Sequence, residues 1–320
     1  MSTEISANSP IYVAGHRGMV GSAITRALDR HGFTNVITKS SKELDLRDQQ
    51  QTMRFFEENR PEVVVLAAAR VGGILANRDY PYQFIHDNLT LQTNVINAAH
   101  QFDVDRLIFL GSSCIYPREA PQPMREDSLL TGPLESTNEW YAVAKIAGLK
   151  MCQALRQQYG RCYFSLMPTN LYGPYDNFDL ETSHVLPALI RKFHEALPDG
   201  DVELWGSGTP QREFLHVDDL AEAVITFLNN DPEFDYYNVG TGKDISIREL
   251  SELIQEITGH TGTIRWDTSK PDGTPRKLLD VSRIMETGWQ PKYTLREGIR
   301  DTLDWFIKNK SHLKEVHIER

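Results

Sequence analysis

Ile11-Tyr-Val-Ala-Gly-His-Arg-Gly-Met-Val-Gly21 sets the architecture expected for the whole chain. The apolar run at 11–14 predicts a buried strand, and the residues from the last glycine to about Arg30 have a helical pattern. A strand, a glycine loop and a helix in this order predict a dinucleotide site, because bare backbone and a helix N-terminus then face the pyrophosphate. The glycine spacing is G-x-x-G-x-x-G rather than G-x-G-x-x-G, and glycine loops that serve only as turns are also common.

Strand-like and helix-like segments alternate after this motif. Strands are expected at 35–38, 62–69, 106–110 and 163–167, and helices at 47–59, 81–102 and 140–159. The strand at 62–69 is almost continuously apolar, as is usual when helices cover both faces of a parallel sheet. The pattern predicts an α/β fold with a doubly wound parallel Rossmann sheet and a smaller C-terminal α/β lobe that binds substrate. We assign residues 1–172, with 213–240 returning, to the Rossmann domain, and 173–212 and 241–320 to the lobe.

The bulk properties favour a globular enzyme and exclude several other classes. The chain has 320 residues and a net charge of −10, which argues against nucleic acid as the main partner. No apolar run approaches the roughly 20 residues that span a bilayer, and residues 1–10 lack the features of a signal peptide. The three cysteines form no Cys-x-x-Cys pair. We therefore expect a cytoplasmic protein without a disulfide framework, a membrane partner or a metal site.

Residues with catalytic chemistry gather between 109 and 145. Ser112 and Cys114 follow a predicted strand, and Tyr141 and Lys145 are spaced to share one face of a helix. A lysine ammonium beside a phenol is expected to lower the phenol's pKa from about 10, so that Tyr141 exchanges a proton with a carbonyl oxygen that Ser112 also holds. With 12 tyrosines, such a Tyr-x-x-x-Lys pair also arises by accident. A lone cysteine after a strand is commonly just a small buried side chain.

The residues after the second predicted strand bear on the choice of cofactor. NAD sites commonly place a carboxylate there for the ribose hydroxyls. This chain instead has Lys39-Ser-Ser-Lys42, and its first carboxylate is Glu43. Lysines and hydroxyls suit a 2′-phosphate, with which Arg17 could also stack or pair. We therefore predict NADP(H) over NAD(H), with solvated loop lysines as the alternative.

Gly15-x-x-Gly18-x-x-Gly21, Ser112 and Tyr141-x-x-x-Lys145 resemble the extended short-chain dehydrogenase/reductase superfamily. Longer segments resemble the branch that converts GDP-4-keto-6-deoxy-D-mannose to GDP-L-fucose. They are Gly15-His-Arg-Gly-Met-Val-Gly21, Leu66-Ala-Ala-Ala-Arg-Val-Gly-Gly73, Gly111-Ser-Ser-Cys-Ile-Tyr-Pro117, Met167-Pro-Thr-Asn-Leu-Tyr-Gly-Pro174, Asp176-Asn-Phe178, Ser183-His184 and Ser269-Lys-Pro-Asp-Gly-Thr-Pro-Arg-Lys277. The resemblance extends from residue 11 to about residue 306. It implies 3,5-epimerisation and NADPH-dependent 4-reduction, and a homodimer built through helices of the larger domain.

The resemblance also implies roles for individual residues. Cys114 matches the family's base and His184 its acid, for epimerisation at the carbons beside the C4 ketone. Tyr141 then protonates the C4 oxygen with help from Ser112, while Lys145 holds the ribose. The implied cofactor-binding residues are Gly15, His16, Arg17, Gly18, Met19, Val20, Gly21, Lys39, Ser41, Leu46, Ala67, Ala68, Leu110, Gly111, Ser113, Lys145, Pro168, Thr169, Asn170, Leu171 and His184. The GDP-sugar is expected to contact Lys192, Trp205, Arg212 and Lys277, with a core position as the alternative for the tryptophan.

Two positions depart from the family, and rival functions remain. The family often has an arginine for the 2′-phosphate at Ser41, and an arginine for the diphosphate at Lys192. A 4,6-dehydratase would usually have an Asp-Glu pair where this chain has Cys114-Ile115. A nucleotide-sugar 4-epimerase would need an acidic residue after the second strand. Another NADP-dependent keto-sugar-nucleotide enzyme and a catalytically silent NADP-binding scaffold stay as alternatives. Recognition of guanine rests on the resemblance alone.

Overall fold

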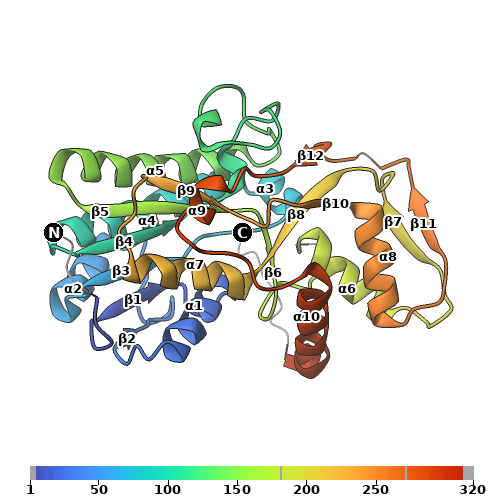
Figure 1. Ribbon diagram of the computed structural model, residues 1–320, viewed down its shortest axis with the longest axis horizontal. Coiled ribbons are helices and arrows are strands. Elements are labelled where there is room, and N and C mark those ends of the chain that lie inside the picture. Colours follow the sequence, from blue (N-terminus) through green and yellow to red (C-terminus); the bar gives the residue numbers. More distant parts are fainter. Residues whose placement is uncertain (1–4, 181, 271, 313–320) are drawn as a thin grey trace.

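A six-stranded parallel sheet forms the centre of the computed structural model, which describes residues 5–180, 182–270 and 272–312 (Figure 1). Residues 1–4 of the segment tested for a signal peptide, Pro271 of the segment 269–277 and the end of the predicted lobe lie outside this description. The strands are β1 (Ile11–Ala14), β2 (Val36–Ile37), β3 (Val63–Leu66), β4 (Arg106–Leu110), β5 (Cys162–Pro168) and β9 (Tyr236–Val239). Their order is β2-β1-β3-β4-β5-β9. Every neighbouring pair is parallel, which confirms the predicted doubly wound Rossmann sheet.

Helices cover both faces of this sheet because alternate strand residues point to opposite sides. Ile11 and Val13 join the core formed with α1 (Met19–Arg30) and α7 (Val217–Asn229). Tyr12 and Ala14 join a second core, formed with α2 (Gln49–Asn59) and α4 (Pro81–Gln101). Helix α5 (Glu139–Tyr159) packs along α4. The short helix α3 (Ile74–Asp79) comes directly before α4 in the chain. Among the helices of the described residues, none has the length and apolar character needed to cross a membrane.

A second group of elements lies beyond the sheet, at the right of the view in Figure 1. Its strands are β6 (Asn170–Tyr172), β7 (Val202–Trp205), β8 (Gln211–His216), β10 (Asp244–Ser246), β11 (Ile264–Asp267) and β12 (Arg276–Lys277). Strand β8 pairs with β6, β10 and β12, and β7 pairs with β11. The helices of this group are α6 (Val185–Glu195), α8 (Ile247–Thr258) and α10 (Leu295–Asn309), whereas α9 (Ser282–Met285) packs against β9 of the main sheet. Strand β12 lies in the segment 269–277, where the sequence analysis predicted no strand.

The buried Arg106 joins the sheet to helix α7. Its side chain donates hydrogen bonds to the carbonyls of Phe227, Leu228 and Asn230, and to the carboxylate of Asp231. These carbonyls lie at the C-terminal end of α7, where a helix leaves carbonyl groups without partners and carries partial negative charge. Arg106 is only 3% exposed, so these partners, rather than water, stabilise its buried guanidinium group. It thereby fixes the point at which the chain leaves α7 for β9.

Replacing Arg106 with methionine should lower the free energy of unfolding by about 3–5 kcal/mol, because several buried carbonyls lose a charged donor. Chemical denaturation monitored by circular dichroism measures this change. Arg125→Met is the matched control, since the Arg125 side chain is 65% exposed and pairs with the exposed Asp127. Its change should stay within about 0.5 kcal/mol. Equal losses in the two variants would contradict a structural role for Arg106.

Candidate active site

The glycine loop between β1 and α1 is shaped to receive a dinucleotide. Gly15 has a φ of +89°, and a Cβ there would lie 2.7 Å from the backbone nitrogen of Ala68. A Cβ on Gly21 would overlap the carbonyl oxygen of Gly15. Gly18 is the N-cap of α1, and neither a capping side chain nor an acidic residue occupies the first turn. The N–H groups at this helix end are therefore oriented to hold an anion such as a pyrophosphate.

The other residues expected at the cofactor line the carboxyl edge of the sheet. His16, Arg17, Met19 and Val20 belong to the glycine loop and the first turn of α1, Ala67 and Ala68 follow β3, and Leu110 and Gly111 lie at the end of β4. Pro168 ends β5, Asn170 and Leu171 belong to β6, and Ser113 opens a short 3-10 helix. Leu46 precedes α2, and its carbonyl accepts a hydrogen bond from Asn94. Since parallel strands end at one edge, these segments meet where ligands bind in open α/β sheets.

Arg17 and Lys39 come together around one carboxylate. The Glu43 carboxylate accepts hydrogen bonds from the hydroxyl and the backbone N–H of Ser40. The hydroxyl bond is the largest cause that lowers the pKa of Glu43, and the charges of Lys39 and Arg17 lower it further. Two cations from different loops thus share this corner, as a 2′-phosphate would require, although Glu43 balances part of their charge. The sequence analysis had noted Glu43 only as a carboxylate set too late to bind a ribose.

Ser112, Cys114, Tyr141 and Lys145 meet where β4 ends against α5. The backbone N–H of Cys114 donates to Ser112 Oγ at 3.3 Å. Lys145 is 3% exposed, and its Nζ donates to the carbonyl of Leu110 at 2.8 Å and lies 5.6 Å from the centroid of the Tyr141 ring. The charge of the Cys114 thiolate acts on the pKa values of both Tyr141 and Lys145. The predicted catalytic residues therefore form one cluster.

Burial dominates the acid–base properties of this cluster. Desolvation raises the pKa of the Tyr141 phenol and lowers the pKa of the Lys145 ammonium to about 8. The expected lowering of the phenol's pKa by the lysine is therefore wrong, because both charged forms lose water in the same site. Desolvation also raises the pKa of the Cys114 thiol, while Ser112, Lys277 and Lys145 act in the opposite direction. Tyr141 nevertheless keeps part of its surface accessible, so the cluster opens toward solvent.

His184 reaches the same edge of the sheet by a different route. It is the N-cap of α6, at the end of the irregular segment after β6. The Gly73 N–H donates to the Thr182 carbonyl at 3.1 Å, which holds this segment against the loop after β3. Desolvation lowers the pKa of the imidazole. Among the described residues, no hydrogen bond joins His184 to Cys114 or Tyr141.

The four residues expected to hold the substrate lie on α6, β7 and the paired strands β8 and β12. Arg212 and Lys277 are direct partners in the β8–β12 register. Burial lowers the pKa of Lys277, the Cys114 thiolate raises it and the Arg212 charge lowers it, so Lys277 connects this pair to the catalytic cluster. Trp205 ends β7 and is 62% exposed, so the alternative of a core tryptophan is wrong. Lys192 donates to the carbonyl of Glu203 on the same strand at 3.1 Å.

Three acidic residues that sequence reasoning missed shape the surroundings of these residues. Asp272 accepts hydrogen bonds from the backbone and the hydroxyl of Ser207, beside Trp205, at 2.9 and 2.7 Å. Glu135 accepts a hydrogen bond from the hydroxyl of Thr274 at 3.2 Å. Glu213, next to Arg212, is fully buried. In the sequence, Asp272 is marked only by its place inside the basic segment 269–277, and Glu213 only by its neighbour Arg212. No sequence pattern marks Glu135.

Comparison with known proteins agrees with this geometry. Residues 11–240 match the NAD dependent epimerase/dehydratase family. GDP-L-fucose synthase 1 of Arabidopsis thaliana is 56% identical over 304 residues, covering 94% of this chain and 94% of that protein. GDP-L-fucose synthase of Escherichia coli strain K12 is 51% identical over 315 residues, covering 95% of this chain and 98% of that protein. A solved structure of a GDP-L-fucose synthetase from Naegleria fowleri, bound to NADP, has a TM-score of 0.90 at 29% identity and covers 98% of this chain and 97% of that one.

These similarities span the glycine loop, the catalytic cluster and the elements that carry the expected substrate residues. They confirm the resemblance inferred from the motifs. The chain therefore belongs to the NAD dependent epimerase/dehydratase family and, within it, to the GDP-L-fucose synthases.

Proposed function

We propose that this protein converts GDP-4-keto-6-deoxy-D-mannose to GDP-L-fucose by 3,5-epimerisation and NADPH-dependent 4-reduction. The observation that carries the proposal is the position of Cys114 within the cluster of Ser112, Tyr141 and Lys145. Reduction alone requires a proton donor at the carbonyl oxygen, whereas epimerisation also requires a group that moves protons at carbon. The thiol supplies that second group, and relatives at 51% and 56% identity are named GDP-L-fucose synthases.

The residues present fit NADP(H). The bare glycine backbone and the uncapped N-terminus of α1 suit the pyrophosphate, and Arg17 with Lys39 suits the 2′-phosphate. Lys145 would hold the nicotinamide ribose. When bound, NADPH supplies the hydride that reduces C4. Ser41 contributes only a hydroxyl at the position where the family often has an arginine.

Epimerisation requires proton transfer at C3 and C5. The C4 ketone acidifies both positions, because the resulting carbanion is delocalised onto the carbonyl oxygen. Cys114 removes the proton from one face of the sugar, and His184 supplies one from the other. Lys145 and Lys277 favour the thiolate that this step needs, against the desolvation of the thiol. Ser112 and Tyr141 stabilise the negative charge on the C4 oxygen.

Reduction uses the same oxygen contacts. Tyr141 gives its proton to the C4 oxygen, and its raised pKa keeps the phenol protonated until that charge develops. Ser112 holds the oxygen during the transfer. The cations Arg212 and Lys277 suit the diphosphate of the substrate, with Lys192 and the exposed Trp205 farther along the lobe. One site therefore performs both reactions.

We further propose that the enzyme works as a cytoplasmic homodimer. Trp140 and Val143 of α5 expose large apolar side chains, at 44% and 37%. Exposed apolar side chains close together on a helix favour contact with another protein surface. The three cysteines are free thiols, as a reducing compartment would keep them.

Turnover is the direct test of the proposed reaction. Purified protein with GDP-4-keto-6-deoxy-D-mannose and NADPH should lose the absorbance of reduced nicotinamide and yield GDP-L-fucose, identified by mass spectrometry and NMR. An unepimerised 4-reduced sugar would remove Cys114 and His184 from the mechanism and leave a simple reductase. Absence of oxidation would contradict the proposal and favour a silent scaffold.

Cys114→Ser should reduce formation of the epimerised product by about 10²-fold or more, because the thiolate base is lost, while NADPH affinity stays unchanged. Cys152→Ser is the matched control, since Cys152 is a fully buried thiol in the core between sheet and helices. Tyr141→Phe should remove the reduction. Product analysis by NMR distinguishes these effects, and wild-type turnover by Cys114→Ser would exclude the thiol as base.

Gly18→Ala should weaken NADPH binding by about tenfold or more, while the protein stays folded. The new methyl group has room in the protein, because the nearest atom, the carbonyl oxygen of Gly15, would lie 3.5 Å away. A bound pyrophosphate would press against that methyl group. Fluorescence titration with NADPH measures the affinity, and Gly132→Ala, in the loop before α5, is the control. Unchanged affinity would place the pyrophosphate elsewhere.

A further inference from the structure

We propose that Glu213 is a positioning residue for the substrate: its buried carboxylate holds Arg212 and Lys277 side by side, so that the two cations grip a nucleoside diphosphate. The inference rests on the proposed function and deepens it, because it identifies what arranges the cations at that site.

Glu213 connects three segments that are distant in the sequence. It lies in β8 and is fully buried. Its Oε1 accepts a hydrogen bond from the N–H of Gly242 at 2.7 Å, and its Oε2 accepts one from the N–H of Leu279 at 3.0 Å. Leu279 follows Lys277 by two residues, so the carboxylate holds the chain immediately after β12 against β8.

Strand β12 is short and brings two cations together. It has only two residues, and the pairing Lys277↔Arg212 places two like charges in adjacent strands. Like charges that face each other across strands are destabilising, and the Arg212 charge indeed lowers the pKa of Lys277. Arg276 of this strand pairs with Asp244 on β10, and the N–H of Leu278 donates to Gln122, but neither bond involves either of the two cations. The carboxylate of Glu213 accepts a charge-assisted hydrogen bond from the N–H of Leu279, just after β12. This bond keeps the two cations together before any diphosphate is bound.

The surroundings of Glu213 are built to accept a carboxylate. A Cβ on Gly240 would overlap Oε1, so this glycine leaves the space that the carboxylate fills. Desolvation raises the pKa of Glu213, and the N–H groups of Leu279 and Gly242 lower it in part. A buried charge held by backbone N–H groups has a desolvation cost that an apolar residue would avoid. A buried carboxylate of this kind is expected where it holds other groups of the protein in position.

The main chain of Glu213 extends this link toward the cofactor edge. Its carbonyl accepts hydrogen bonds from the side chain of Asn170 at 2.8 Å and from the hydroxyl of Thr169 at 3.2 Å. Both residues follow β5, at the edge assigned to the cofactor. One residue therefore sets the position of the diphosphate cations relative to the catalytic edge of the sheet.

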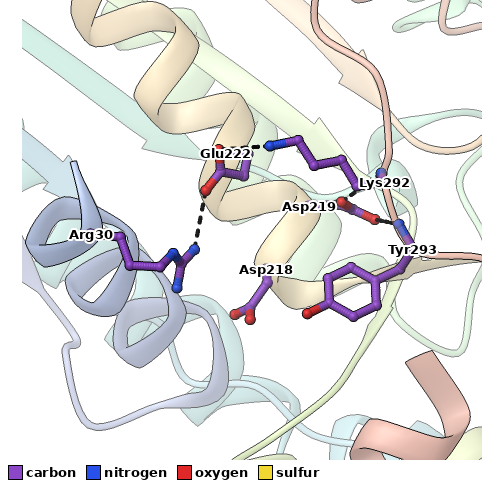
Figure 2. Close-up of a pocket in the computed structure, with 6 residues that line it drawn as sticks. All are labelled: Arg30, Asp218, Asp219, Glu222, Lys292 and Tyr293. Carbon is purple, nitrogen blue, oxygen red and sulfur yellow. Dashed lines mark hydrogen bonds and ion pairs between the residues drawn. The ribbon is translucent and has the colours of Figure 1, made fainter. Parts of the chain in front are cut away.

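Asp219 provides a matched control in the same chain. Its carboxylate is 1% exposed and accepts hydrogen bonds from the backbone of Lys292 at 2.8 Å and of Tyr293 at 3.1 Å (Figure 2). These residues line a pocket beside α7 together with Arg30, Asp218 and Glu222. Arg30 is the last residue of α1, about 16 Å along the helix from the glycine loop. Asp219→Asn thus removes the same kind of buried carboxylate without touching Arg212 or Lys277.

The experiment measures binding of GDP and of NADP⁺ to the full chain by calorimetry, with thermal melting as a check on folding. Glu213→Gln should weaken GDP binding by about tenfold or more and change NADP⁺ affinity by no more than about twofold. Asp219→Asn should lower the melting temperature but leave GDP affinity within about twofold. Equal losses of GDP affinity in the two variants, or none in Glu213→Gln, would overturn the inference.

A mutant cycle separates positioning from general destabilisation. Lys277→Met should cost about tenfold in GDP affinity in the wild-type chain but clearly less when Glu213→Gln is already present. Full additivity would contradict the coupling. If Glu213→Gln does not fold, Glu213→Asp takes its place, because it keeps the charge but is too short to reach both N–H groups. It should weaken GDP binding in the same direction.

UDP serves as the probe that distinguishes this inference from the proposed function. Wild-type protein that binds UDP but not GDP would contradict the proposed substrate, whereas a loss of UDP affinity in Glu213→Gln would still support the positioning role. Wild-type protein that binds NADP⁺ and neither nucleotide would overturn both.

Discussion

The hydrogen bond from Lys145 to the carbonyl of Leu110 is the interaction on which the site depends. A buried ammonium needs a partner, and here the partner is the last carbonyl of the central strand β4. The bond therefore fixes α5 against the carboxyl edge of the sheet. Tyr141, one turn earlier on α5, and Ser112 and Cys114, just after β4, are brought together as a consequence. Their altered pKa values follow from the same burial.

The second group of strands adds to this cluster what the Rossmann sheet lacks. In the proposed function, the sheet supplies the glycine loop for the cofactor, and α5 supplies the proton donor for the carbonyl, whereas the cations proposed to hold the substrate diphosphate come from the second group. Strands β8 and β12 supply Arg212 and Lys277, and Lys277 lies close enough to act on the charge of Cys114. Helix α7 follows β8 directly and leads back to β9 in the main sheet, with Arg106 holding its far end. Arg212 and Lys277 are thus connected to the carboxyl edge of the sheet by continuous, hydrogen-bonded structure.

Much of the fold and of the catalytic cluster followed from local patterns. The strand at 11–14, the glycine loop and the spacing of Tyr141 and Lys145 are local in sequence, so periodicity and composition were enough to locate them. The pKa of Tyr141 was mispredicted for a different reason. A lysine four residues away was visible in the sequence. The loss of solvent around both groups depends on neighbours from other elements, such as Phe84 of α4 and Phe109 of β4, and desolvation dominates the pKa of Tyr141.

The sequence by itself determined the parallel α/β fold and the dinucleotide loop, and it predicted the catalytic side chains, because each of these rests on short local motifs. Only the tertiary structure decided that Lys277 stands beside Arg212, that Glu43 lies between Arg17 and Lys39, and that Glu213 accepts from Gly242 and Leu279. These contacts join residues far apart along the chain or in separate loops. Their strength comes from burial and charge, which no single stretch of sequence contains.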